Sequence, residues 1–267
     1  MPAPTLIDIG INLVHDSYDH DRAEVIAAAK AAGVTRMIVT GSSLEVSRRA
    51  IALSRQWPGT LWCTAGVHPH HAGEFDEAGV PVLEALAREP EVVAVGECGL
   101  DYFRNYSPHA DQERALRLQL GIAARLGKPL FLHQRDAHRE LLRLLDPFLP
   151  RIPRAVVHCM TGTVEEARDY LERGLYIGIT GWICDERRGH HLREVVRAIP
   201  PGRLMIETDG PYLLPRDLKP KPSSRRNEPR YLPHVLQAVA DARGEPAGVL
   251  SGIIERTTRE FFGLPAP

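Results

Sequence analysis

Five apolar segments of this sequence are each followed by a side chain that can bind a metal ion or transfer a proton. These side chains are His68, Glu97, His133, His158 and Asp209. Imidazole and carboxylate groups together suit a divalent ion such as Zn²⁺, Mn²⁺ or Mg²⁺, and donor type alone does not choose among the three. A single histidine of this kind is more often a structural residue than a ligand. Five such groups at equivalent positions favour one shared site.

The segment 92–101 contains the carboxylate around which the other groups are expected to gather. Residues 92–95 are apolar and predict a strand buried on both faces, as in parallel sheets covered by helices. Gly96 and Gly99 then flank Glu97 and Cys98, and glycine lets backbone or ligand approach closely. We expect the strand to end here and the chain to turn. That would place Glu97 at the carboxyl end of a strand, where α/β enzymes carry their chemistry.

Eight apolar segments with the character of strands alternate with segments of helical character. Strands are expected at 5–11, 36–40, 61–66, 92–95, 129–132, 155–157, 175–179 and 204–206. Helices are expected at 21–32, 44–56, 82–88, 107–126, 137–145, 163–173, 231–243 and 247–262, with one more ending at 199. The alternation predicts an α/β protein with a (β/α)8 TIM barrel of the metal-dependent hydrolase type, in one domain over residues 1–267. An open doubly wound sheet is the alternative, but no Gly-x-Gly-x-x-Gly follows the first strand.

Composition and charge narrow the class of protein. The 267 residues include 43% hydrophobic and 25% charged residues, as in soluble globular proteins. The formal net charge of −1 means that binding to nucleic acid requires a local group of cations. No apolar run reaches the length of a membrane span, and the first residues lack a secretory signal. Four scattered cysteines argue against disulfides or a structural zinc site and predict a cytoplasmic location.

A loop rich in cations and prolines follows Asp209 and suggests the substrate. Arginine forks and serine hydroxyls match phosphate oxygens, although a solvated surface loop is the alternative. The expected phosphate contacts are Arg216, Lys221, Ser223, Ser224, Arg225 and Arg226, with Arg135 just beyond the fifth strand. Aromatic residues near strand ends can stack on unpaired bases, although aromatic side chains are more often part of a core. These residues are Tyr102, Phe103, Tyr106, Trp182 and Tyr212.

Six segments together resemble the TatD family of metal-dependent deoxyribonucleases, and the similarity runs through nearly the whole chain. They are residues 66–70, 96–101, 133–137, 158–162, 207–212 and 220–229. The resemblance implies a TIM barrel, a divalent metal that is usually Mg²⁺ (with Mn²⁺ or Zn²⁺ as alternatives) and 3′→5′ exonuclease activity on single-stranded DNA, extending to RNA. It also implies that Glu97, His133 and His158 are metal ligands. Asp209 matches the catalytic aspartate, and His68 matches a histidine at the mouth of the active site.

One departure from the family lies at the end of the first strand. Many members carry His-x-His where this chain carries Gly10, Ile11 and Asn12. Glycine cannot bind a metal and asparagine is a poor replacement for imidazole, so we expect one firmly held ion and a second only with substrate phosphate. Two other functions stay open: a metal-dependent amide or ester hydrolase such as an aminoacyl-tRNA deacylase, and a non-catalytic nucleic-acid-binding barrel. Neither a membrane nor an obligate protein partner is inferred.

Overall fold

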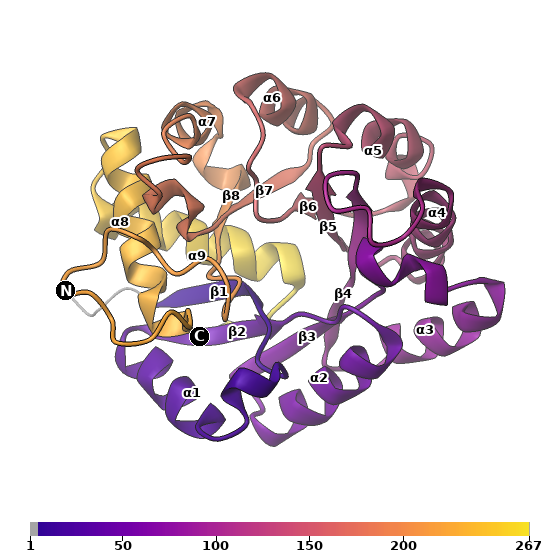
Figure 1. Cartoon of the computed structure of the whole chain (residues 1–267), viewed down its shortest axis with the longest axis horizontal. Coiled ribbons are helices and arrows are strands. Elements are labelled where there is room, and N and C mark those ends of the chain that lie inside the picture. The colour runs from indigo at the N-terminus through magenta and orange to yellow at the C-terminus, as the bar shows by residue number, and fades with distance from the viewer. Residues whose placement is uncertain (1–4, 267) are drawn as a thin grey trace. The chain divides into compact units, whose positions relative to one another are not determined.

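Contacts within the chain divide it into two compact units. The computed structural model describes residues 5–266 (Figure 1). Unit 1 comprises the described part of residues 1–38 and 159–267, and unit 2 comprises residues 39–158. Within the described residues, a strand followed by a helix occurs eight times. This is the element order of a (β/α)8 TIM barrel and confirms the predicted fold class. That residues 1–267 form a single domain stays a prediction.

Unit 2 contains four parallel strands that pair in chain order. They are β3 (Leu61–Ala65), β4 (Val92–Asp101), β5 (Leu130–Arg135) and β6 (Ala155–Val157). The helices α2 (Leu44–Gln56), α3 (Val80–Ala87), α4 (His109–Leu126) and α5 (His138–Leu145) lie along one side of these strands in Figure 1. Side chains such as Val95, Leu130 and Leu132 are completely buried. The strands are buried beneath these helices, and this burial explains why their sequences are continuously apolar.

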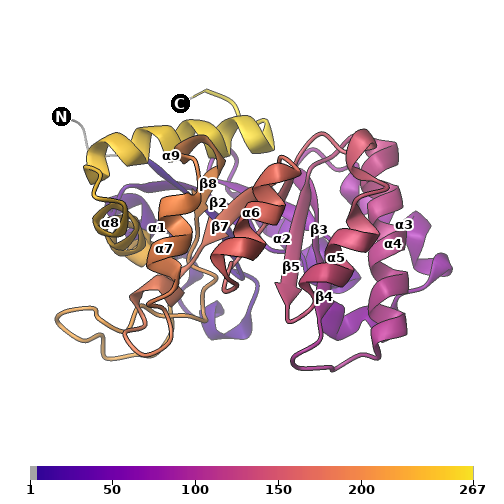
Figure 2. The same cartoon turned by 90° about the horizontal axis from the view of Figure 1, so that it is seen from above.

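Unit 1 contains the remaining strands and five helices. The strands are β1 (Leu6–Ile11), β2 (Val34–Val39, up to Ile38), β7 (Tyr176–Ile179) and β8 (Leu204–Ile206), of which β7 and β8 pair in parallel. The helices are α1 (Arg22–Ala31), α6 (Val164–Glu172), α7 (Leu192–Ala198), α8 (Leu232–Arg243) and α9 (Ala247–Phe262). The capping box expected between Thr163 and Glu166 is present at the start of α6. Figure 2 shows the loop between β8 and α8, in orange, extending beyond the ends of α7 and α8.

Short 3₁₀ helices in the connections were not among the expected elements. They are η1 (Asp16–Tyr18), η2 (Pro69–Glu74), η3 (Glu77–Gly79), η4 (Leu149–Arg151), η5 (Gly181–Cys184), η6 (Pro201–Arg203) and η7 (Pro229–Tyr231). The prediction that the fourth strand ends and turns at Gly96 is wrong, because β4 continues to Asp101. The two glycines there permit close contact between β4 and β5 instead of a turn.

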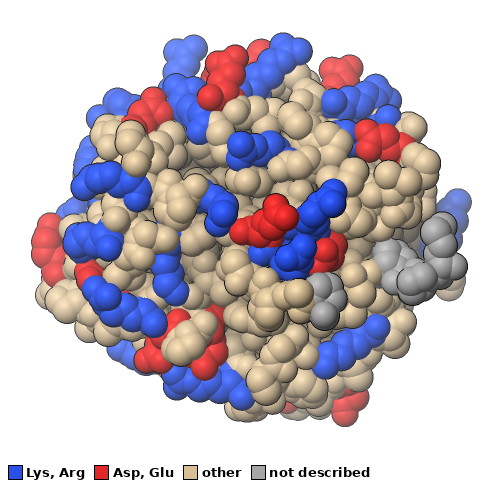
Figure 3. Space-filling model, turned by 180° about the vertical axis from the view of Figure 1, so that it is seen from behind, with Lys and Arg blue, Asp and Glu red and all other residues tan. Residues whose placement is uncertain are grey.

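Charged side chains of both signs are spread over the face drawn in Figure 3. On the face drawn in Figure 3, Lys and Arg side chains are interspersed with uncharged residues, and several lie beside Asp or Glu. In the part of the chain that the structure describes, no helix is both long and apolar enough to cross a membrane. Attraction of a polyanion must therefore come from a local group of cations.

A fully buried acid, Asp8, connects β1 to the segment after β8. Its Oδ1 accepts hydrogen bonds from the backbone N–H groups of Gly10 (3.2 Å) and Thr208 (3.0 Å), and its Oδ2 lies against the Thr208 hydroxyl. Burial raises the pKa of Asp8 to about 7, although these hydrogen bonds oppose the rise. The Thr208 hydroxyl donates to Oδ2, so all three contacts favour the ionised acid, and burial outweighs them.

The substitution Asp8→Asn is expected to remove a pH-dependent part of the stability. Because the folded pKa is raised, the contribution of Asp8 is fully present below pH 3.8 and is lost as the pH rises through about 7. Over that window the stability of the wild type relative to Asp8→Asn should fall by about 4 kcal/mol. Urea unfolding of both proteins at several pH values measures the difference. A difference that does not vary between pH 4 and 7 would contradict a neutral Asp8.

Candidate functional site

Two glycines let β4 lie directly against β5 and bring Glu97 into the site. Gly96 has φ 144° and Gly99 has φ 150°, a region that other residues rarely adopt. A Cβ at position 99 would lie 1.9 Å from the carbonyl oxygen of His133. The strand register shifts between Gly96 and Cys98, so Glu97 is the additional residue of a β-bulge. Its N–H donates to the carbonyl of Gly41 at 2.7 Å, which fixes the backbone that carries the carboxylate.

Three imidazole rings converge on one carboxylate oxygen of Glu97. The distances from its Oε1 are 2.7 Å to His158 Nε2, 3.0 Å to His133 Nδ1 and 3.3 Å to His68 Nε2. The four residues follow or lie in β3, β4, β5 and β6, and all belong to unit 2. Glu97, His158 and His68 are each less than a tenth exposed. The structure thus brings together four of the five groups that the strand ends suggested.

The charge state of Glu97 depends on its histidine neighbours. Burial alone would raise the pKa of Glu97, but electrostatic interactions with His158 and His68 and hydrogen bonds from His133 and His158 hold it well below the usual value. For His133, burial alone would lower the pKa, but contacts with Asp101 and Glu97 outweigh burial and raise the pKa above its ordinary value. The cluster therefore contains an ionised carboxylate that is surrounded by basic nitrogens.

The hydrogen bonding of His68 distinguishes it from the other two histidines. Its Nδ1 accepts the backbone N–H of His70 at 3.0 Å, at the start of η2. Burial lowers the pKa of His68 to about 4, so the ring is neutral at pH 7. A neutral ring whose Nδ1 accepts carries its proton on Nε2, the nitrogen that faces Glu97. His68 is therefore better suited to donate a hydrogen bond than to bind a metal ion.

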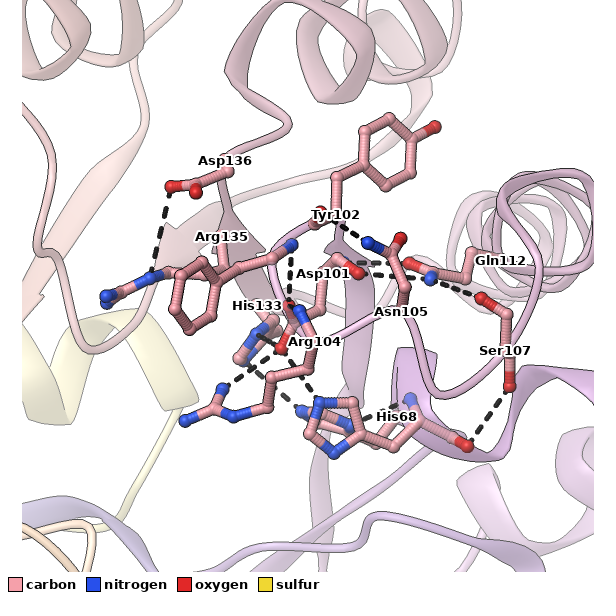
Figure 4. A network of polar contacts seen from close by, with 12 residues as sticks. His68, Asp101, Tyr102, Arg104, Asn105, Ser107, Gln112, His133, Arg135 and Asp136 are labelled. Carbon is pink, nitrogen blue, oxygen red and sulfur yellow. Dashed lines mark hydrogen bonds and ion pairs between the residues drawn. The ribbon is translucent and has the colours of Figure 1, made fainter.

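Asp101, at the end of β4, supports the cluster from behind His133 (Figure 4). Its carboxylate is fully buried and accepts from His70 Nε2 at 2.8 Å, Arg104 Nη1 at 3.0 Å and two backbone N–H groups. Burial raises its pKa, but these hydrogen bonds and contacts hold the pKa far below the usual range. Asp101 Oδ2 lies 3.4 Å from His133 Nε2. His133 thus stands between two carboxylates, the arrangement that orients metal-binding histidines.

The donor set fits a divalent cation. His133 Nε2 faces Asp101 at 3.4 Å, and His133 Nδ1 shares Glu97 Oε1 with two further rings, so three ring nitrogens and a carboxylate oxygen meet at one point. Metal–nitrogen and metal–oxygen bonds of about 2.1 Å place neighbouring ligand atoms roughly 3 Å apart. The spacing of 2.7–3.3 Å around Glu97 Oε1 is close to that value. Ligand atoms of His68, Glu97 and His133 lie within 4.8 Å of one another, close enough to hold an ion, and His158 Nε2 lies 2.7 Å from Glu97 Oε1.

In unit 1, Asn12 holds the carboxylate of Asp209. Asn12 Nδ2 donates to Asp209 Oδ1 at 3.1 Å and to the carbonyl of Gly210 at 3.1 Å. The Asp209 N–H donates in turn to the carbonyl of Gly10 at 2.8 Å. Asp209 adopts φ 54°, a conformation that these bonds support. Gly10 and Asn12, at and after the end of β1, therefore hold the aspartate in place.

The cation-rich loop between β8 and α8 of unit 1, called the basic loop, contains cations of two kinds. Arg226 is bound by Asp21 at 2.5 Å and by Glu228 at 2.9 Å, and its guanidinium lies over Tyr18. These carboxylates occupy its guanidinium, so Arg226 anchors the loop. Arg216 is half exposed and lies 3.8 Å from both Asp185 and Glu186. Exposed side chains fill most of the remaining loop positions: Lys219, Lys221, Ser223, Ser224 and Arg225.

Arg135 ends β5 in unit 2 and lies beside an exposed aromatic side chain. Its guanidinium lies over the ring of Phe103, at 5.1 Å from the ring centroid. Phe103 and Tyr106 are 60% and 71% exposed, and the Tyr106 ring contacts His70 edge to face at 4.7 Å. These aromatic rings follow β4 directly, next to the Asp101 network. They offer flat apolar surfaces beside a cation.

Several residues that shape the site were not identified as such from the sequence. Asp101 and His70 form its supporting network, and Gln112 of α4 holds the Asp101 backbone through bonds of 2.8 and 3.1 Å. The signal for Asp101 was its place directly after Leu100 in the apolar run. The two histidines that follow Pro69 were a similar signal. Gln112 had none, because its role depends on how α4 packs.

Comparisons with known proteins match nearly the whole chain. A family model described as TatD related DNase matches residues 7–263. A "3′-5′ ssDNA/RNA exonuclease TatD" of Cronobacter sakazakii is 54% identical, covering 96% of this chain and 97% of that protein. The protein of the same name from Escherichia coli K12 is 51% identical, covering 97% and 99%. A crystal structure of a hydrolase TatD family protein from Entamoeba histolytica superposes with a TM-score of 0.90 at 27% identity, covering 98% and 99%.

Proposed function

The chain belongs to the family of TatD-related DNases, and we propose that it is a divalent-metal-dependent 3′→5′ exonuclease of single-stranded DNA and RNA. It is a hydrolase of phosphodiester bonds. The observation that carries the proposal is the convergence of three imidazoles on Glu97 Oε1 in a chain whose relatives bear that name.

The proposed ligands of the ion are Glu97, His133 and His158. The carboxylate supplies the negative charge, and Asp101 behind His133 keeps that ring oriented. Mg²⁺ is the proposed ion, with Mn²⁺ or Zn²⁺ as alternatives, because the mixed oxygen and nitrogen donors accept all three. Once bound, a divalent ion supplies an acidified water and polarises a phosphoryl oxygen.

The remaining groups act on the proton and on the charge of the phosphate. We assign to Asp209 the orientation and deprotonation of the attacking water, from its match to the family's catalytic aspartate. His68 is neutral and holds its proton on Nε2, so it can donate to a phosphate oxygen. Donors of this kind stabilise charge that develops as the phosphodiester is attacked.

Substrate contacts are assigned to cations and aromatic rings that reach solvent. In unit 2 these are Arg135, Phe103 and Tyr106. In unit 1 the proposed phosphate contacts are Arg216, Lys221, Ser223, Ser224 and Arg225, while Arg226 holds the loop through Asp21. Bases are free to stack on such rings only in a single strand, which supports the proposed preference. A cytoplasmic location stays part of the proposal.

End-labelled single strands test the activity and its direction. Metal-stripped protein is incubated with 3′-labelled or 5′-labelled DNA or RNA, with Mg²⁺, Mn²⁺ or Zn²⁺ restored. We expect immediate release of the 3′ label as mononucleotide and stepwise shortening of the 5′-labelled strand. Turnover of an aminoacylated RNA without shortening would show the ester hydrolase instead. Salt-sensitive binding without turnover would show the non-catalytic barrel.

Truncation of the exposed aromatic rings should weaken binding of single strands. Phe103→Ala and Tyr106→Ala are each expected to raise KM for an oligonucleotide about fivefold, because a base–aromatic stack contributes ~1 kcal/mol or more. The kcat should change little, since neither ring touches the reacting atoms. Val249→Ala serves as the matched control, because Val249 is 60% exposed on α9. Unchanged KM in both aromatic variants would exclude the stacking role.

A further inference from the structure

A second group of metal-binding side chains lies in unit 1, apart from the Glu97 cluster in sequence. Cys184 ends η5, Asp217 lies in the basic loop, and His234 lies in the first turn of α8. The thiol sulfur, a carboxylate oxygen and a ring nitrogen all lie within 4.8 Å of one another. Asp217 Oδ1 and His234 Nε2 are 2.7 Å apart. Three elements that are distant in the sequence thus present three different ligand atoms to one point.

The accessibility of the three side chains suits an ion that enters from solvent. Cys184 is 5% exposed, so the sulfur forms the floor of the group. The side chains of His234 and Asp217 are 33% and 49% exposed and form its open side. An ion bound here would keep room for water as a fourth ligand, as in sites with three protein ligands.

The charges of the donor set balance a divalent ion. A thiolate and a carboxylate carry two negative charges, and a neutral imidazole adds none. Burial raises the pKa of the Cys184 thiol to about 12, so binding must replace the thiol proton, which leaves to solvent. Thiolate and imidazole together favour Zn²⁺ over Mg²⁺, which prefers oxygen ligands.

We propose that Cys184, Asp217 and His234 form a second cation site, selective for Zn²⁺ and similar soft divalent ions, which ties the basic loop to η5 and α8. Arg216 directly precedes Asp217 and lies 3.8 Å from Asp185, the residue after Cys184. An ion bound to Asp217 therefore fixes the segment that carries Arg216. The site is independent of the proposed exonuclease activity, since none of its ligands belongs to the Glu97 cluster.

Cobalt provides a direct readout, because a thiolate bound to Co²⁺ gives a charge-transfer band in the near ultraviolet that oxygen and nitrogen ligands do not give. Metal-stripped full-length protein is titrated with Co²⁺. We expect a thiolate band whose final intensity corresponds to one thiolate-bound ion per chain, with Co²⁺ at the Glu97 cluster adding no such band, and that disappears when Zn²⁺ is added. Cys184→Ser should remove the band, whereas Cys63→Ser, the matched buried cysteine in unit 2, should keep it.

The other two ligands are tested with surface variants that should not disturb folding. Asp217→Asn and His234→Gln are expected to need at least about tenfold more Co²⁺ to reach half of the band. A missing band in the wild type, or a band that survives Cys184→Ser, would overturn the site. Wild-type titration in both Asp217→Asn and His234→Gln would show thiolate binding outside this group and would overturn it equally. In support, Zn²⁺ should protect the wild type, but not Cys184→Ser, from trypsin cleavage after Arg216.

Discussion

Replacement of Glu97 by alanine is expected to reduce nucleotide release from 3′-labelled single-stranded DNA by at least about 10³-fold, or ~4 kcal/mol of transition-state stabilisation. Glu97 is the carboxylate on which His68, His133 and His158 converge. Without its negative charge, the nitrogens that surround it have no anion with which to hold a divalent ion. The affinity for Mn²⁺, measured by calorimetry on metal-stripped protein, should fall together with activity.

Two further variants separate charge from shape in this experiment. Glu97→Gln keeps the volume of the side chain but not its charge, and we expect the same loss. Glu74→Gln is the control, because that side chain is 81% exposed on η2. Asp209→Ala should lower release at least about 10²-fold in the same assay, as expected for a general base. Full activity in either Glu97 variant, with an unchanged melting temperature, would remove the metal assignment.

The substitution Gly99→Ala should lower the free energy of unfolding by at least ~3 kcal/mol. The added Cβ would lie 1.9 Å from the carbonyl oxygen of His133, and φ at this position is 150°. A backbone carbonyl cannot rotate away as a long side chain can, so β4 and β5 must separate. Because His133 and Glu97 lie on these two strands, metal affinity should fall as well. Urea unfolding monitored by circular dichroism measures the change.

Gly252→Ala is the matched control for this substitution. Gly252 lies in α9, where an added Cβ meets nothing within 4 Å. Alanine is a better helix former than glycine, so this variant should gain about 0.5–1 kcal/mol. If Gly99→Ala unfolded at the urea concentration of the wild type, the close contact between β4 and β5 would not be the reason for a glycine at this position.

The positions of the elements were predictable because apolar runs and helix caps are local signals. The predicted strand at 155–157 coincides with β6, and the predicted helix at 44–56 coincides with α2. The convergence of Glu97, His133 and His158 followed from one geometric rule, that parallel strands in a barrel end at the same face. A rule about strand ends needs no knowledge of side-chain packing. The roles of these residues stay predictions.

What could not be predicted depends on contacts between distant residues. Gly99 resembles a turn glycine in the sequence, whereas in the structure it permits backbone contact with His133. The loop arginines look alike as letters, but Arg226 is bound by Asp21, which lies far from it in the sequence. Cys184 was seen only as one of four scattered cysteines, because Asp217 and His234 approach it only through the fold. The spacing of residues in the sequence does not predict contacts between residues that lie far apart in it.

All the side chains that meet at Glu97 Oε1 come from one uninterrupted stretch, Val39–His158. The proposed ligands of the ion are therefore encoded in one continuous segment of the gene. Recombination outside that segment can exchange the loop between β8 and α8 while these side chains stay unaltered.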